Sequence, residues 1–445
     1  MKIISTYKTK ILHYNNIFSA SVKAYQKAVD YFITVCLENW TYLSAFSTNK
    51  RKQGAVEKLT ILTKSNPESR YCFPEADKQF QKFPSYLRRA AITEAIGKVS
   101  SYKSNLANWE NEVPAAKGKR PRMPKAGNIY PVLYKGNMYK QSGPYEFIIK
   151  VWVRNTWDWL TVNVRKSDMD YINKHCKTRK QLSPKLQKRY RNWYLDFCFE
   201  EAAVLNDTPI AEKVAVAVDL GINNACTCSI MYSDGTVAGR HFLKLPAEED
   251  SLNHAINRIK KAQQHGARKM PRLWGKAKGI NQDISVKTAN FIMDTATLYS
   301  ADVIVFEALD TSGKKKGSKK QRLHHWKAKT VQTMVADKAH RLGIRISHVC
   351  AWGTSRLAYD GSGRVLRGED AGLPSYSVCR FQTGKVYNCD LSASYNIGAR
   401  YFIRELLKSL PEKVKLEVLA KVPELSKRTT CTLSSLIGMH AVLCS

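Results

Sequence analysis

Acidic residues, paired cysteines and long apolar runs are scarce or missing in this sequence of 445 residues. Lys and Arg total 72 against 37 Asp and Glu, which gives a formal net charge of +35. So large a surplus is costly in self-repulsion unless a polyanion is bound, and nucleic acid is the natural counterpart. No apolar run is long enough to span a bilayer, and residues 1–16 lack the apolar core of a signal peptide. The sequence therefore predicts a cytoplasmic protein with no membrane partner.

The 11 cysteines are odd in number and scattered, and none stands in a Cys-x-x-Cys pair. With 44% hydrophobic residues the chain can bury large cores, so it needs no disulfide staples. These cysteines are therefore predicted to be reduced thiols. The length favours roughly two to four domains.

Three carboxylates stand next to apolar segments of the second half. Val-Ala-Val-Ala-Val precedes Asp219, and Val-Ile-Val-Phe precedes Glu307. Such short β-branched runs are typical of buried central strands, so both carboxylates are expected at strand ends. Asp390 opens the segment Asp-Leu-Ser-Ala-Ser-Tyr-Asn-Ile, which predicts a helix. One such acid usually only caps a strand, whereas three together indicate a site.

The sequence resembles a known family in the order of these motifs. Asp-Leu-Gly-Ile-Asn-Asn, then Phe-Glu-Ala-Leu, then Asp-Leu-Ser-Ala-Ser-Tyr-Asn-Ile resembles the split RuvC nuclease of TnpB proteins and miniature type V CRISPR effectors. The resemblance is close over the second half and extends to the first half only in layout. It implies an α/β multidomain fold: an RNase H-like (RuvC) nuclease domain, and a β-barrel wedge domain with an inserted helical recognition lobe. It also implies a prokaryotic protein that binds guide RNA and target DNA as a monomer or homodimer.

Composition and the resemblance together predict seven segments. They are the first strand of the wedge barrel (residues 1–15), the helical recognition lobe (16–113), the wedge β-barrel (114–210), the RuvC nuclease domain (211–350) with a helical insertion at about 248–299, a degenerate zinc-ribbon-like insertion (351–388), the last RuvC motif and its helix (389–412), and a C-terminal tail (413–445).

Periodicity predicts the elements within these segments. Helices are expected over residues 16–38, 85–112, 248–267, 280–299, 326–342 and 391–410. Strands are expected over residues 146–154, 159–165, 190–200, 214–219, 225–232, 237–244, 303–307 and 344–349. The three strands that follow residue 213 are predicted to form an antiparallel meander.

The chemistry of phosphodiester cleavage explains why three acids are needed. In-line attack uses two divalent ions about 3.5 to 4 Å apart, and Mg²⁺ takes oxygen ligands. Asp219, Glu307 and Asp390 match the acids of the family motif. They are the predicted catalytic residues and the predicted ligands of two Mg²⁺ ions, with Asp219 bridging both. Asp302 and Asp310 flank the second strand without a motif match and are expected at the surface.

The family pattern breaks ahead of Asp390. Relatives carry a four-cysteine zinc ribbon that begins Thr-Ser-x-x-Cys-x-x-Cys. Here Thr354 and Ser355 are present, but Ala358 and Gly361 occupy the first two cysteine positions. Zinc needs four soft or imidazole ligands at fixed spacing, so no zinc is predicted. The Tyr-Asp-Gly-Ser-Gly turn that follows Ala358 predicts a metal-free β-ribbon.

Basic side chains gather in three segments. One is the polar face of the helix at residues 85–112, another is the Pro-rich linker at 114–125, and the third is the Gly- and Lys-rich stretch at 312–322, predicted to be a lid beside Glu307. A charged helix face can equally be solvated without binding anything. The predicted nucleic-acid contacts are Arg88, Arg89, Lys119, Arg120, Arg122, Lys314, Lys315, Lys316, Lys319 and Lys320.

The predicted function is RNA-guided, Mg²⁺-dependent DNA cleavage beside a short adjacent motif. Two alternatives stay open: a cleavage-inactive RNA-guided DNA-binding regulator, and a DNA transposase with an RNase H-like fold. A pure binder has no need to hold three acids together against their mutual repulsion. The transposase is disfavoured by the long basic first half and by the late position of Asp390.

Overall fold

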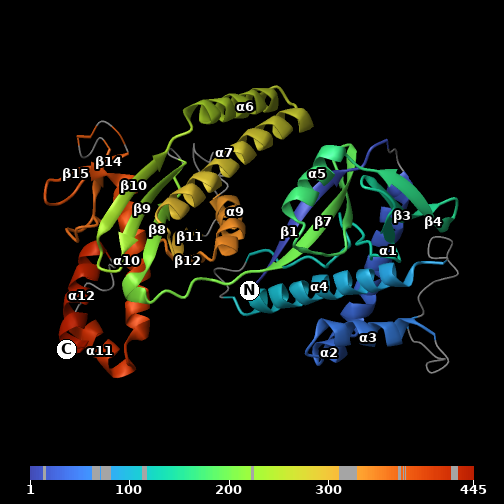
Figure 1. Cartoon of the computed structure of the whole chain (residues 1–445), viewed down its shortest axis with the longest axis horizontal. Coiled ribbons are helices and arrows are strands. Elements are labelled where there is room, and N and C mark those ends of the chain that lie inside the picture. The colour runs from blue at the N-terminus through green and yellow to red at the C-terminus, as the bar shows by residue number, and fades with distance from the viewer. Residues whose placement is uncertain are drawn as a thin grey trace. The chain divides into compact units, whose positions relative to one another are not determined.

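The computed structural model describes residues 1–13, 17–62, 71, 82–112, 118–221, 225–309, 328–368, 372–373, 375, 377–421 and 429–444. The chain divides into two compact units, one of residues Lys2–Glu201 and one of Ala202–Ser445 together with Met1. Figure 1 shows the elements of each unit. Within the described residues, no helix is both long enough and apolar enough to cross a membrane.

Four helices lie ahead of residue 111 in the described part of the first unit. They are α1 (Ile17–Glu38), α2 (Trp40–Ser44), α3 (Asn49–Thr60) and α4 (Ser85–Glu110). The helical spacing of apolar residues buries Phe18, Tyr25 and Phe32 of α1 and Leu87 of α4 in one core. The two helices predicted at residues 16–38 and 85–112 are confirmed. The short helices α2 and α3 were not predicted.

The strands of the first unit form two sheets. They are β1 (Lys2–Lys10), β2 (Tyr139–Gln141), β3 (Glu146–Val153), β4 (Thr156–Asn163), β5 (Lys180–Gln181), β6 (Lys185–Arg189) and β7 (Asn192–Ala202). One sheet has the order β1-β7-β5 with β6 also on β7, and the other has the order β2-β3-β4. The strands expected over residues 146–154, 159–165 and 190–200 are confirmed to within a few residues.

The described part of this unit shows two sheets and no closed form of the predicted β-barrel. Ladders do not join the two sheets, which meet at the isolated bridges Ile11–Val164 and Val132–Lys185. Helix α5 (Lys166–His175) follows β4, and β5 is only 2 residues long, so β5 offers no long edge for closure. Both sheets share the apolar core of the helices.

The second unit is built on a five-stranded sheet with the order β10-β9-β8-β11-β12. Its strands are β8 (Val214–Asp219), β9 (Cys226–Tyr232), β10 (Val237–Leu243), β11 (Val303–Ala308) and β12 (Arg345–Cys350). Strands β8, β9 and β10 form the predicted antiparallel meander, whereas β8, β11 and β12 run parallel.

Helices cover both faces of this sheet. They are α7 (Pro271–Leu298), α9 (Ala328–Ala339), α10 (Cys389–Ser409), α11 (Glu412–Lys421) and α12 (Thr430–Cys444), with short 3₁₀ turns at Ile210–Glu212 and His340–Leu342. Helix α6 (Pro246–Gln264) packs on α7 through Ala255 and Ile259. Alternation along the strands sends Ala217 and Val305 to the core under α10 and α12. It sends Val218 and Phe306 to the core under α7 and α9. The result is a three-layer α/β/α unit.

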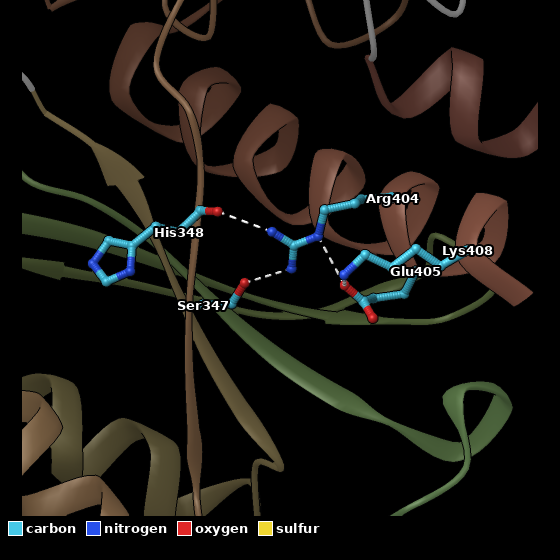
Figure 2. Close-up of polar contacts among 5 residues, drawn as sticks. All are labelled: Ser347, His348, Arg404, Glu405 and Lys408. Carbon is cyan, nitrogen blue, oxygen red and sulfur yellow. Dashed lines mark hydrogen bonds and ion pairs between the residues drawn. The ribbon is translucent and has the colours of Figure 1, made fainter. Parts of the chain in front are cut away.

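Arg404 fastens α10 to the outer strand of the sheet. Its guanidinium donates to the Ser347 hydroxyl at 2.7 Å and to the His348 carbonyl at 3.0 Å (Figure 2). It also pairs with Glu405 at 2.8 Å, and Lys408 lies 3.3 Å from the same carboxylate. Helix α10 is therefore fixed along β12 as well as over the sheet.

A small ribbon precedes α10. It contains β13 (Leu366–Arg367), β14 (Val378–Arg380) and β15 (Val386–Asn388). The predicted turn is present: the Ala358 amide donates to the Gly363 carbonyl at 2.9 Å, and Gly361 has a φ of +81°. Side chains fill the centre of the ribbon, where the buried residues are Ala358, Cys379, Phe381 and Cys389.

Asp302 is not the surface residue that the sequence suggested. It is 8% exposed. Its carboxylate accepts hydrogen bonds from the Val214 amide at 3.0 Å and from the Thr208 hydroxyl, so it joins the starts of β8 and β11. Hydrogen bonding compensates the desolvation of this acid. Asp310 lies outside the described residues.

Candidate functional site

Asp219 and Glu307 occupy matching positions on neighbouring strands. The parallel register of β8 and β11 pairs Val218 with Phe306. Each acid is the next residue of its strand, so both leave the sheet at the edge formed by the carboxyl ends of β8 and β11. Polar groups at this edge of a parallel sheet are where α/β proteins commonly bind ligands.

Asp390 comes to the same edge from helix α10. It lies in the first turn, two residues after the N-cap Asn388, whose side chain accepts a hydrogen bond from the Leu391 amide at 2.9 Å. Further along the helix, Gly398 permits close packing on the sheet. A Cβ atom there would stand 2.9 Å from the Met231 sulfur and 3.3 Å from the Ala217 Cβ. The absence of a side chain therefore lets α10 lie tightly over β8 and β9.

The electrostatics of Asp219 show that the three acids interact. Burial raises the pKa of Asp219 well above its ordinary value, and the charges of Glu307 and Asp390 raise it further. The guanidinium of Arg367, on the ribbon strand β13, acts in the opposite direction. The structure therefore brings the three predicted residues into one cluster of like charge.

Glu307 is held by neutral and cationic neighbours. Burial raises its pKa, while a hydrogen bond from the Thr354 hydroxyl and the charge of Arg400 oppose that rise. The side-chain amide of Gln332 donates to the Glu307 main-chain carbonyl at 3.0 Å. Both the backbone and the side chain of this acid are therefore fixed by surrounding groups.

The donor chemistry of the cluster suits a hard divalent cation. Three carboxylates offer oxygen ligands, and a cation would relieve the repulsion that raises the pKa of Asp219. In the part of the chain that the structure describes, no three His, Cys, Asp or Glu side chains lie close enough to hold one ion. The acids thus form an interacting cluster that is more open than a closed ligand set.

The predicted nucleic-acid contacts differ in their surroundings. Lys119, Arg120 and Arg122 are exposed in the linker. Arg89 on α4 is engaged in an ion pair with Glu57 at 2.9 Å, and Arg88 beside it is only partly exposed. The remaining predicted contacts, Lys314, Lys315, Lys316, Lys319 and Lys320, lie outside the described residues.

Sequence reasoning did not identify the polar residues that surround the acids. Thr354 was noted only as the start of the ribbon, and Asn396, Arg400 and Arg367 were not singled out. The available signal was the position of Asn396 and Arg400 in the largely apolar stretch from Tyr395 to Ile403 of α10, where both are buried. Buried polar groups are hydrogen-bonded, so such residues point to a structural network.

Comparison with known proteins gives two relatives from Aquifex aeolicus (strain VF5). The model of the Aq_aa04 family matches residues 5–153. The uncharacterized protein aq_aa04 is 30% identical over 124 residues, which cover 25% of this chain and 68% of that protein. The TnpB-like protein aq_aa05 is 26% identical over 241 residues, which cover 48% of this chain and 76% of that protein.

A solved structure shares the overall architecture. The mini-RNA-guided endonuclease CRISPR-Cas_phi3 matches with a TM-score of 0.50 and 10% identity, covering 90% of this chain and 92% of the other. At this identity the likeness speaks for the α/β multidomain fold alone. The sequence relatives carry the assignment further: the chain belongs to the Aq_aa04 family, and over 48% of its length it is similar to a TnpB-like protein.

Proposed function

We propose that this protein is an RNA-guided DNA endonuclease that cuts target DNA beside a short adjacent motif. Asp219, Glu307 and Asp390 are its catalytic carboxylates and the ligands of two Mg²⁺ ions. The observation that carries the proposal is the interaction of all three acids at one edge of the sheet. The sheet order β10-β9-β8-β11-β12 is also the one expected of an RNase H-like nuclease.

The chain's own residues have distinct tasks in this chemistry. When bound, two divalent cations supply an activated water and stabilise the leaving oxygen. Asp219 interacts with both other acids, so it would contact both ions, while Glu307 and Asp390 would each hold one. Thr354 keeps the Glu307 carboxylate in place, and Arg367 offers positive charge beside Asp219.

Charge supports a nucleic-acid partner. The net charge of +35 exceeds what solubility requires, and the linker residues Lys119, Arg120 and Arg122 are exposed. In the proposed scheme guide RNA neutralises much of this charge. Base pairing between guide and target then supplies sequence specificity, while the protein reads duplex shape and the adjacent motif.

The test begins with the RNA that copurifies from cells expressing the native locus. Cleavage of a plasmid library matched to that RNA is then measured in Mg²⁺ for wild type and Asp219→Ala. A defined RNA and cuts that disappear in the variant support the proposal. A defined RNA without cuts favours the RNA-guided regulator. The absence of any defined RNA overturns both and favours the transposase.

A further inference from the structure

The Thr354 hydroxyl donates a hydrogen bond to the Glu307 carboxylate, and Thr354 itself is 2% exposed. Its hydroxyl also lies 3.0 Å from the Ala351 carbonyl. A hydroxyl has one proton to give, and a bond to a charged acceptor is the stronger of the two. The Thr354 hydroxyl therefore donates its hydrogen bond to an ionised Glu307 carboxylate.

The segment that carries Thr354 is held by a ladder of three side chains on α10. Asn396, Arg400 and Arg404 recur every four residues, so they share one face of the helix. Each donates to main-chain carbonyls of the chain that runs from β12 into the ribbon. The acceptors are His348 for Arg404 (3.0 Å), Cys350 and Trp352 for Arg400 (2.6 and 2.7 Å), and Thr354 and Leu357 for Asn396 (both 2.9 Å).

The ladder is part of the buried structure. Asn396 is 0% exposed and Arg400 is 5% exposed. Losing a partner of a buried polar group costs its desolvation, so these contacts strongly favour one placement of the segment. The last side chain of the ladder, Asn396, donates a hydrogen bond to the main-chain carbonyl of Thr354 itself. Helix α10 also carries Asp390, six residues before Asn396.

We propose that Thr354 is a positioning residue for Glu307, and that the α10 ladder sets the place of Thr354. Two acids from different elements are thereby held as one unit: Asp390 directly by α10, and Glu307 by α10 through Thr354. The inference rests on the proposed function, because Glu307 needs an exact orientation only if it binds a metal ion. Groups that orient metal ligands in this way typically change metal affinity or activity by about 10- to 100-fold when they are removed.

Binding of Mn²⁺ to the full chain, read from the electron paramagnetic resonance of the free ion, tests the inference without a cleavage assay. Thr354→Val removes the hydroxyl at nearly constant volume and is expected to weaken Mn²⁺ binding by about 10-fold or more. Thr354→Ser restores the hydroxyl and should restore the affinity. Thr288→Val is the matched control, since Thr288 is also 2% exposed and its hydroxyl bonds the Ile284 carbonyl of its own helix at 2.8 Å.

Arg400→Lys tests the ladder. Lysine keeps a positive charge near Glu307 but lacks the planar guanidinium, whose Nη1 donates to both the Cys350 and the Trp352 carbonyls. A loss of Mn²⁺ affinity in this variant supports positioning, because the charge has been retained. If Arg400→Lys binds Mn²⁺ as tightly as wild type does, the claim that the α10 ladder sets the place of Thr354 is overturned.

The remaining outcomes separate this inference from the proposed function. If wild type binds Mn²⁺ more tightly than Asp219→Asn, while Thr354→Val binds as wild type does, the role of Thr354 is overturned and the metal site stands. If Thr354→Ser is as impaired as Thr354→Val, or Thr288→Val is equally impaired, the hydroxyl has no specific part. If wild type and Asp219→Asn bind alike, the metal site itself is refuted.

Discussion

Asp219 and Glu307 each stand one residue beyond the Val218–Phe306 pair that joins the parallel strands β8 and β11. The backbones of both residues are paired with neighbouring strands, and their side chains emerge at the edge formed by the carboxyl ends of β8 and β11. Burial and the charges of Glu307 and Asp390 together raise the pKa of Asp219. The consequences can be measured in cleavage, in stability and in binding.

Asp219→Asn should abolish DNA cleavage and leave RNA binding unchanged. The amide keeps the shape of the side chain but loses the charge that would hold both ions. Metal ions contribute several kcal/mol of transition-state stabilisation, so a loss on the order of a thousandfold is expected. Cleavage rates with the copurified RNA provide the measurement. Cutting at the wild-type rate would show that the acid has another role.

The same substitution should raise the melting temperature of the metal-free protein at neutral pH. Folding raises the pKa of Asp219 well above its ordinary value. A group of this kind contributes its full stability below its unfolded-state pKa, about 4, and that stability is lost as the pH rises through the folded-state pKa. Wild type should lose stability over this window, whereas the amide does not titrate.

Thermal denaturation in EDTA, from about pH 4 to about pH 8, checks this expectation. The melting temperature of Asp219→Asn should exceed that of wild type only slightly at the acidic end, and the difference should grow with pH. Added Mg²⁺ should then narrow or reverse the difference, because a ligand that binds the native state stabilises it. A difference that stays constant across the pH range would argue against ionisation of Asp219 as its cause.

Zinc should be absent from the purified protein. Ala358 stands at a position where relatives have a ribbon cysteine, and it packs with Cys379, Phe381 and Cys389 in the centre of the ribbon. We therefore expect side-chain packing, and not a zinc ion, to hold the ribbon together. Elemental analysis should give far less than one zinc per chain, and a zinc chelator should leave the melting temperature unchanged. Stoichiometric zinc would contradict the prediction.

Neutralising the exposed linker arginines should reduce the salt dependence of RNA binding. Arg120→Gln combined with Arg122→Gln removes two charges, and each released counterion changes the slope of log K against log salt by about 0.7 to 0.9. The slope should therefore fall by about 1.4 to 1.8 in titrations at several salt concentrations. Arg89→Gln is the comparison, because its ion pair with Glu57 already uses its charge, and a smaller change is expected there.

The elements that carry the acids could be predicted because their signals are local. Apolar runs that end in Asp219 and Glu307 indicate buried strands, and the structure confirms both. A local pattern does not say which strands pair with each other. The pairing of β8 with β11 is therefore known only from the structure. The same limit explains the barrel: alternation predicts strands but not whether their edges close.

Polar helices and buried acids were harder to predict. Helix α5 has two buried apolar residues, Met169 and Ile172, too few to give a clear period. Helix α7 begins at Pro271, whereas the sequence predicted a start at residue 280. The prediction missed the first turns because they are basic and contain glycine. Asp302 looked like a surface acid because its partner Val214 lies far away in the sequence.

Arg400 and Arg404 also determine how the sheet ends. The carbonyls that they occupy, on Cys350 and His348, are two residues apart in β12 and so face the same way. Strand β12 is the last strand on that side of the sheet. A strand from another molecule would need these carbonyls as acceptors to continue the ladder. Because helix α10 already engages both, the same contacts that hold the chain beside Glu307 protect this edge against intermolecular β-sheet growth.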